Sequence, residues 1–458
     1  MTQYTVTNPA TGQTEAQYPT ATDEQVQDAI AAADKAFAVL AGLAAAERAA
    51  LLHRVADLHA ERRDELAAII TREMGKPIGQ SLGEVDIVVS IYRYYAENGP
   101  GFLAEDVLTP AAGGSAVVRK EGLGPLLGIM PWNFPYYQVA RFAAPNLMIG
   151  NTILLKPAPQ CPESALAMEA IFRDSGLPDG AYVTLFATND QIADAIADPR
   201  VAGVSLTGSE RAGAAVAETA GRHLKKVVLE LGGSDPFVVL DADGAGMDGL
   251  VKRAVVARLG NAGQACNAAK RFVVLDEVYD EFVEKFTAAL AATAPGDPTD
   301  PGTFLGPLSS RAAADTLQGQ LDAAVAGGAT VLLPGGKTAE DSAYFRPAVL
   351  ADVTPDMGLY YEELFGPVAM VFRARSEAEA VAIANDTPFG LGASVHSGDA
   401  ERAARVADQI TAGMVSINEA GGSAAELPFG GVKRSGVGRE LGRYGMEEFV
   451  NRKLIRTR

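Results

Sequence analysis

Cysteine is scarce in this sequence: the 458 residues include two, Cys161 and Cys266. Two cysteines cannot form a disulfide framework, so we expect a cytoplasmic protein in a reducing compartment. We interpret Cys161 as a small buried residue, which is the usual environment of a free cysteine. Histidine is also rare, and the four histidines show no metal-ligand spacing, so we expect no metal site.

Positive charge and long apolar runs are lacking as well. Lys and Arg number 39 against 57 Asp and Glu, which gives a formal net charge of −18. This charge disfavours nucleic acid and anionic membrane surfaces as partners. An uncharged stretch at 122–140 is interrupted by Pro125, Pro131 and Pro135, and Met1–Gln13 is polar. We therefore expect neither a membrane span nor a signal peptide.

The composition is that of a globular protein with several domain-sized units, since 48% of the residues are hydrophobic and 21% are charged. The N-terminal part predicts helices. Thr22 and Gln25 form a capping-box signature at the start of one helix, and further helices are expected over 45–74 and 78–98. Residues 105–121 differ and predict an extended hairpin.

A β/α alternation follows. Apolar runs that suit strands buried on both faces lie at 126–130, 152–155, 181–186, 201–206 and 227–229, and a second series lies at 236–240, 272–275, 330–333, 367–372, 392–396 and 414–417. In the second series the helical stretches are at 247–260, 278–292, 309–326, 376–385 and 399–410. The pattern predicts an α/β fold with two doubly wound domains.

Polar groups gather where the predicted strands end. Ligands of open α/β sheets bind beyond the carboxyl ends of the strands, and the runs of the first series lead into loop 131–135, Lys156, Thr207-Gly208-Ser209 and Glu230. Cys266 lies in a loop rich in Gly and Ala, where a carbonyl compound could reach its sulfur. The dinucleotide fingerprint Gly-x-Gly-x-x-Gly is absent after the first strand, which by itself argues against a dinucleotide.

Several strings in the chain match one known family in order and spacing, from about residue 20 to the C-terminus. They are Pro-Trp-Asn-Phe-Pro at 131–135, Lys156-Pro157, Thr207-Gly208-Ser209, Leu229-Glu230-Leu231-Gly232-Gly233, Gly263-Gln264-Ala265-Cys266, Glu362-Glu363-Leu364-Phe365-Gly366-Pro367, Pro428-Phe429-Gly430-Gly431-Val432-Lys433 and Ser435-Gly436. The chain resembles the aldehyde dehydrogenase superfamily, and within it most resembles the succinate-semialdehyde dehydrogenases.

The resemblance implies three catalytic residues. Cys266 would attack the aldehyde carbon and form a thiohemiacetal, then a thioester. A cysteine with an ordinary pKa is only about 3% thiolate at neutral pH, so it needs activation. Glu230 would be the general base, either for the thiol or for the water that hydrolyses the thioester. Asn133 would stabilise the oxyanion together with the backbone N–H of Cys266.

The resemblance also implies NADP or NAD as cofactor. The cofactor-binding residues would be Trp132, Lys156, Gly208, Ser209, Leu231, Glu363 and Phe365, with the pyrophosphate at the helix that follows Ser209. NAD-preferring members often carry a glutamate three residues after the lysine, and here Pro159 stands there. Without that carboxylate a 2′-phosphate could pair with Lys156, so we expect NADP to be preferred, with NAD also usable.

Arg141 is the candidate for substrate selection. Succinate-semialdehyde dehydrogenases carry an arginine at this position, and a guanidinium suits a carboxylate. The alternative role is an ordinary salt bridge. Ser423 is assigned to the same task, although Ala424 could equally be the aligned residue, and Phe429 is assigned to the same pocket.

The family's architecture would divide the chain into a dinucleotide-binding domain (1–104 and 122–231), a catalytic domain (232–442) and an oligomerisation element (105–121 and 443–458). A homodimer or homotetramer is expected, because unpaired strand edges invite pairing between chains. Two other functions stay open. One is a dehydrogenase of glutarate semialdehyde or of neutral aliphatic aldehydes, and the other is a catalytically silent structural or binding protein.

Overall fold

The computed structural model describes residues 3–458. Its first sheet has the strand order β19-β9-β8-β5-β6-β7 and matches the first series of apolar runs. The parallel strands are β5 (Pro125–Ile129), β6 (Thr152–Lys156), β7 (Tyr182–Thr184), β8 (Gly203–Thr207) and β9 (Lys226–Glu230), and β19 (Gly436–Val437) pairs with β9 in the antiparallel sense.

Helices cover both faces of this sheet, which is why its strands read as continuous apolar runs. Neighbouring residues point to opposite faces: Leu126 and Ile153 belong to one buried cluster, and Leu127 and Leu154 belong to another. The helices around this sheet are α1 (Asp23–Gly42), α5 (Tyr137–Ile149), α6 (Pro162–Asp174), α7 (Asn189–Ala197) and α8 (Glu210–Arg222). Helix α1 begins at the predicted capping box.

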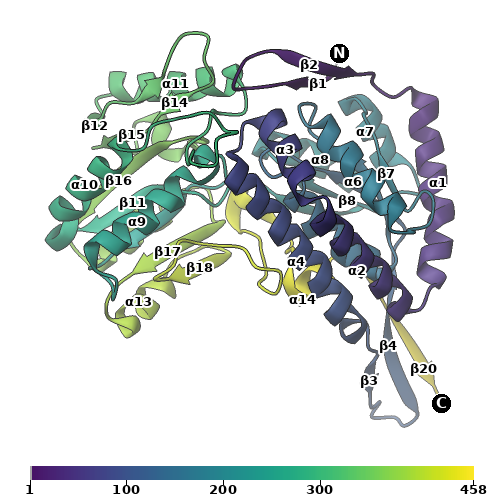
Figure 1. Cartoon of the computed structure of the whole chain (residues 1–458). Coiled ribbons are helices and arrows are strands. Elements are labelled where there is room, and N and C mark those ends of the chain that lie inside the picture. Colours follow the sequence, from purple (N-terminus) through teal and green to yellow (C-terminus); the bar gives the residue numbers. More distant parts are fainter. Residues whose placement is uncertain (1–2) are drawn as a thin grey trace.

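Three more helices pack beside this layer (Figure 1): α2 (Ala45–Glu61), α3 (Arg63–Met74) and α4 (Ile78–Phe102). The prediction of one helix over 45–74 was therefore wrong. Arg62 leaves the helical conformation (φ −102°, ψ 17°), and a new helix begins with Asp64 and Glu65 in its first turn, where negative charge favours a helix N-terminus. Gly75 ends α3 in the left-handed conformation, and a Cβ there would lie 2.7 Å from Pro307.

The second sheet has seven strands in the order β12-β15-β16-β11-β10-β17-β18. They are β10 (Asp235–Val239), β11 (Ala269–Leu275), β12 (Thr330–Leu333), β15 (Ala348–Ala351), β16 (Val368–Ala374), β17 (Gly392–His396) and β18 (Met414–Ile417); all pairs are parallel except β12–β15. Its helices are α9 (Gly246–Leu259), α10 (Asp276–Ala291), α11 (Arg311–Ala326), α12 (Glu377–Asn385) and α13 (Ala400–Ala407). The predicted pair of doubly wound α/β sheets is confirmed.

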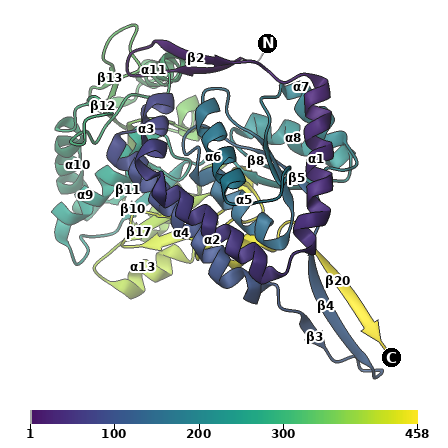
Figure 2. The same cartoon turned by 45° about the vertical axis from the view of Figure 1, so that its right-hand side comes forward.

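A third, three-stranded antiparallel sheet projects from the body as an arm (Figures 1 and 2), with the order β20-β4-β3. Its strands are β3 (Asp106–Leu108), β4 (Ser115–Gly122) and β20 (Val450–Thr457). The predicted hairpin is confirmed, and Gly113 and Gly114 at its turn both have positive φ. Residues far apart in the sequence thus form one arm.

Some elements are not expected from the sequence. They are β1 (Tyr4–Thr7), β2 (Thr14–Tyr18), β13 (Gly336–Lys337), β14 (Phe345–Arg346), β15 and α14 (Gly442–Gly445). The domain ranges stay a prediction. Residues 1–2 of the range 1–104 lie outside the described part, and β19, within the range 232–442, pairs with the first sheet.

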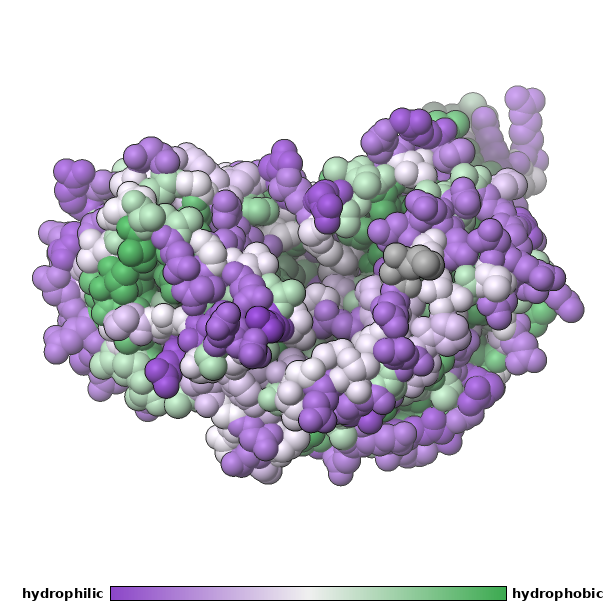
Figure 3. All heavy atoms as spheres, turned by 90° about the horizontal axis from the view of Figure 1, so that it is seen from above, coloured by the Kyte–Doolittle hydropathy of each residue, from purple (hydrophilic) through white to green (hydrophobic). Residues whose placement is uncertain are grey.

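The face of the molecule seen from above is mostly hydrophilic, with scattered apolar patches (Figure 3). In residues 3–458 no single helix is long and apolar enough to cross a bilayer; α1 and α2 meet that length and composition only when taken as a pair, bent by 117°.

Candidate active site

Two cavities meet at Cys266, and together they collect most of the predicted site residues. The strand-end cavity, of about 290 Å³, is lined by Pro131, Trp132, Asn133, Gln138, Thr207, Gly208, Ser209, Glu230, Leu231, Gly232, Cys266, Glu363 and Phe365. The Arg141 cavity, of about 300 Å³, is lined by Gln80, Gly83, Glu84, Ile87, Phe134, Tyr137, Gln138, Arg141, Cys266, Asn267, Gly421, Gly422, Ser423 and Phe429. Cys266 and Gln138 are common to both linings.

The loop before Cys266 has an unusual backbone. Asn261, Ala262 and Gly263 all have positive φ (52°, 54° and 76°), a conformation that costs energy in residues other than glycine. Hydrogen bonds hold it in place: the Asn261 side-chain amide donates to the carbonyl oxygens of Asn133 (2.9 Å) and Gln264 (3.2 Å). The loop that carries the thiol is therefore tied directly to the loop that carries Asn133.

The Cys266 thiol is half-buried, and this environment decides its protonation. Burial raises the pKa of Cys266 to about 12, while the positive charges of Arg141 and Lys270 act in the opposite direction. The sulfur is therefore a thiol at neutral pH, and reaction at a carbonyl requires a group that removes its proton.

Glu230 ends β9 and is buried, and it lines the strand-end cavity together with Cys266. Within residues 3–458 neither carboxylate oxygen has a hydrogen-bond partner. Burial raises the pKa of Glu230 well above its usual value, and Arg141 opposes this shift. A buried carboxyl group with a raised pKa and two free oxygens is suited to accept a proton.

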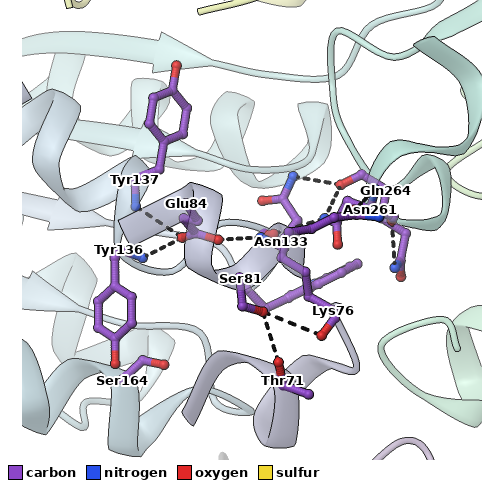
Figure 4. A network of polar contacts seen from close by, with 12 residues as sticks. Thr71, Lys76, Ser81, Glu84, Asn133, Tyr136, Tyr137, Ser164, Asn261 and Gln264 are labelled. Carbon is purple, nitrogen blue, oxygen red and sulfur yellow. Dashed lines mark hydrogen bonds and ion pairs between the residues drawn. The ribbon is translucent and has the colours of Figure 1, made fainter. Parts of the chain in front are cut away.

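Asn133 is held by a buried polar network (Figure 4). Its side-chain amide donates to the Gln264 carbonyl oxygen (3.0 Å). The loop then enters α5, where the Glu84 carboxylate accepts from the backbone N–H groups of Tyr136 (2.9 Å) and Tyr137 (3.1 Å). Glu84 also forms a fully buried ion pair with Lys76. The carboxylate thus satisfies the free N–H groups at the start of α5 and fixes the position of the Asn133 loop.

Arg141 lies on α5 with its guanidinium buried between the rings of Phe429 (4.2 Å from the centroid) and Tyr137 (5.0 Å). Its Nε lies 2.7 Å from Oε2 of Glu440, at an angle outside hydrogen-bond geometry. Its Nη1 and Nη2 have no hydrogen-bond partner in residues 3–458. Burial opposes its charge, but Glu440 and neighbouring groups leave the pKa of Arg141 raised. The structure thus brings the three predicted substrate residues, Arg141, Ser423 and Phe429, into one cavity.

The predicted cofactor residues lie on the other side of the sulfur. Six of the seven line the strand-end cavity: Trp132, Gly208, Ser209, Leu231, Glu363 and Phe365. The rings of Trp132 and Phe365 meet edge to face at 5.7 Å. Ser209 is the N-cap of α8, whose first N–H groups can bind a phosphate.

Lys156, the seventh cofactor residue, ends β6 outside the lining of this cavity. Its side chain is largely buried, its ammonium makes no hydrogen bond or ion pair with residues 3–458 among the contacts described, and burial lowers its pKa. A free cation and a helix N-terminus on one sheet edge fit the ribose and phosphate groups of a dinucleotide. In the described residues no group of three or more His, Cys, Asp or Glu side chains could hold a metal ion.

Sequence reasoning missed five polar residues at the site, namely Glu84, Tyr137, Gln138, Lys270 and Glu440. Tyr137 lies four residues before Arg141 on one helix, so helical spacing could have indicated it. Lys270 lies four residues after Cys266, but the contact of its side chain with the Cys266 loop is visible only in the folded structure. Glu84 and Glu440 come from distant segments, and no signal in a single sequence points to them.

Residues 1–455 match the model of the Aldehyde dehydrogenase family. The chain is 54% identical over 454 residues to a protein of Deinococcus radiodurans named as an NADP(+) succinate-semialdehyde dehydrogenase, covering 99% of this chain and 94% of the relative. It is 45% identical over 450 residues to a protein of Mycobacterium tuberculosis with the same activity in its name, covering 98% of each.

A solved structure agrees with these relatives. The crystal structure of succinic semialdehyde dehydrogenase from Streptococcus pyogenes in complex with NADP+ matches at a TM-score of 0.96 and 41% identity, covering 99% of each chain.

Proposed function

The chain belongs to the aldehyde dehydrogenase family, and from that premise we propose that it oxidises succinate semialdehyde to succinate with NADP, using Cys266 as nucleophile. The choice of substrate rests on one observation. The buried guanidinium of Arg141 has two nitrogens without a hydrogen-bond partner in residues 3–458, and it lines the same cavity as the nucleophile. Relatives named for this activity support the proposal.

The Arg141 cavity suits a short aldehyde with a carboxylate at its far end. Parallel N–H groups of a guanidinium bind a carboxylate through two hydrogen bonds. The hydroxyl groups of Ser423 and Tyr137 in the same cavity offer further donors, and the Tyr137 hydroxyl interacts with both Ser423 and Arg141. We therefore assign the distal carboxylate to Arg141, Ser423 and Tyr137, and the aldehyde end to Cys266.

The reaction would proceed on the sulfur. Glu230 removes the thiol proton, the thiolate attacks the aldehyde carbon, and the developing oxyanion accepts hydrogen bonds from the Asn133 side chain and the Cys266 N–H. A nicotinamide dinucleotide in the strand-end cavity supplies the acceptor for the hydride that leaves this carbon. Glu230 first passes the thiol proton to solvent and then takes a proton from the water that attacks the thioester carbon. The C–S bond breaks, Glu230 returns this proton to the sulfur, and the carboxylic acid is released.

NADP is the cofactor that the local chemistry favours. The segment after Lys156 carries no carboxylate through Pro159, so nothing there repels a 2′-phosphate, and no contact described for residues 3–458 engages the Lys156 ammonium. The relatives named for NADP support this choice. The residues that would hold the cofactor are Lys156, Ser209, Glu363 and Phe365, with Trp132, Gly208 and Leu231 completing the cavity.

One observation supports the rival substrate class, neutral aliphatic aldehydes. Glu440 already lies 2.7 Å from Arg141, so the guanidinium is partly neutralised before any substrate arrives. A neutral aldehyde would need no cation at all, and the catalytic residues would be the same.

A panel of aldehydes separates these substrates. Succinate semialdehyde and butanal have the same chain length, and we expect kcat/KM to favour the former by about 10- to 100-fold, the value of a charge-assisted hydrogen bond. Glutarate semialdehyde tests the length of the cavity. Each aldehyde is assayed with NADP and with NAD, and NADP is expected to give the higher kcat/KM. Equal values for succinate semialdehyde and butanal would remove the carboxylate from the proposal, and a strong NAD preference would remove the cofactor choice.

An Arg141→Met variant is expected to lose about 10- to 100-fold in kcat/KM on succinate semialdehyde and little on butanal, because only the former contacts the guanidinium. The single change leaves Glu440 buried without its counter-ion, which is destabilising. The double variant Arg141→Met/Glu440→Gln removes that charge and is the matched comparison. Parallel losses on both aldehydes would assign Arg141 to the fold and not to the substrate.

We propose that the arm formed by β3, β4 and β20 joins chains into a homodimer or homotetramer. The edge of β20 has no neighbouring strand in residues 3–458, and Val107 and Leu454 on the arm are 77% and 60% exposed. Such an edge with apolar side chains favours pairing with another chain. Light scattering on the purified protein should give at least twice the chain mass of 47.7 kDa. A monomeric mass would contradict the proposal.

We further propose that the enzyme works in the cytoplasm. The support is the low cysteine content, with both cysteines free in the structure.

A further inference from the structure

Lys270 is a buried cation beneath the nucleophile that has no part in the reaction described above. It lies on β11, and its side chain is fully buried. Its ammonium donates to the carbonyl oxygens of Ala265 (2.8 Å) and Cys266 (2.7 Å) and pairs with Oε1 of Glu363 (3.2 Å). Two of the three N–H donors of the ammonium are used in these hydrogen bonds, and the Glu363 carboxylate adds an ion pair. The group is therefore held in one position from three directions.

These contacts determine how the peptide before the sulfur is oriented. In a trans peptide the C=O and the following N–H point in opposite directions. Lys270 holds the Ala265 oxygen on its own side, so the Cys266 N–H is directed away from Lys270. No contact described for residues 3–458 uses that N–H as a donor. Gly233 packs closely against the Cys266 carbonyl oxygen, since a Cβ at Gly233 would lie 2.5 Å from it.

We propose that Lys270 is a positioning residue that keeps the Cys266 N–H directed at the carbonyl oxygen under attack. The inference rests on the proposed thiohemiacetal chemistry at Cys266 and adds to it the side chain that maintains the backbone donor. The Lys270 ammonium also pairs with Glu363, which lines the strand-end cavity. One cation thus contacts both the loop that carries Cys266 and the cavity assigned to the cofactor.

The test compares two reactions of the sulfur that differ in one respect. Acylation by p-nitrophenyl acetate passes through an oxyanion, whereas alkylation by iodoacetamide displaces iodide and forms none. Both consume the thiolate, so the ratio of their rates is independent of the thiolate fraction. Neither needs a dinucleotide, so any role of Glu363 in cofactor binding does not enter.

In a Lys270→Met variant the ratio of acylation to alkylation is expected to fall about 10- to 100-fold, up to the loss that follows removal of one oxyanion donor. Arg271→Met is the matched control. Arg271 is a buried cation on the same strand, but it donates to the carbonyl oxygens of Tyr360 and Ile383, away from the nucleophile loop. Its removal should leave the ratio at the wild-type value.

Lys270→Arg retains a charged donor and should give an intermediate ratio, and it serves as the test if Lys270→Met does not fold. A wild-type ratio in the folded Lys270 variants, with both rates reduced in parallel, would overturn the proposal and leave Lys270 a structural residue. A different result would point to the premise: if the wild-type protein is acylated no faster than a Cys266→Ala variant, the nucleophile itself is wrong and both proposals fall.

Discussion

A Cys266→Ala variant is expected to lose at least about 10⁴-fold in kcat on every aldehyde, the scale of loss when an enzyme nucleophile is removed. Cys266 is the one thiol in the linings of the two cavities as residues 3–458 form them. Alanine is smaller than cysteine and leaves both cavities open, so NADP binding, measured by fluorescence titration, should be unchanged.

Cys161→Ala is the matched control for this variant. Cys161 is fully buried, and burial raises the pKa of its thiol well above its usual value, so it should neither react nor affect turnover. Iodoacetamide gives a second measurement. Because burial raises the pKa of Cys266, inactivation of the wild-type protein should become faster with each step in pH above neutral. Activity retained without Cys266, or lost equally without Cys161, would disprove the assignment.

Glu230→Gln is expected to reduce steady-state turnover by about 10²- to 10⁴-fold, the usual contribution of a general base. The amide keeps the shape of the buried side chain but cannot accept a proton. A rapid-mixing experiment that follows NADPH absorbance separates the two roles open to Glu230. If it activates only the attacking water, the variant should form one NADPH per site in a fast burst and then stall as the thioester. If it also activates the thiol, the burst itself should slow.

The pH dependence provides an independent check. Burial raises the pKa of Glu230, and only the deprotonated form accepts a proton, so wild-type turnover should increase as pH rises through that raised pKa. The Glu230→Gln variant should lose this rise. Steady-state rates in Glu230→Gln equal to the wild type would remove the residue from the mechanism.

Local sequence pattern was sufficient for much of the fold. The run at 392–396 coincides with β17, because a buried parallel strand is apolar throughout. The runs at 330–333 and 414–417 coincide with β12 and β18, the two edge strands of the same sheet, which are only partly buried. The capping box at Thr22 marks the start of α1 for a similarly local reason. Where one segment carries its own signal, the prediction agrees with the structure.

The misses have tertiary causes. The break at Arg62 interrupts a region with helical character on both sides, so only the packing of α2 and α3 determines it. The strands β13 and β14 have two residues each, too few for a periodic pattern. At the site, short sequence motifs shared with the aldehyde dehydrogenases indicated Cys266, Glu230 and Asn133 as catalytic residues. Glu84 accepts from the backbone N–H of Tyr136 beside the Asn133 loop, and Lys270 donates to the backbone carbonyl oxygen of Cys266; no sequence motif records such backbone contacts.

The shared position of Cys266 between two cavities has a consequence for inhibition. An aldehyde analogue in the Arg141 cavity and a dinucleotide in the strand-end cavity would not exclude each other, because the linings of the two cavities share just two side chains. The potency of such a compound would then depend on how much aldehyde is present and be insensitive to the supply of dinucleotide. The Arg141 cavity is thus the better starting point for selective inhibitors.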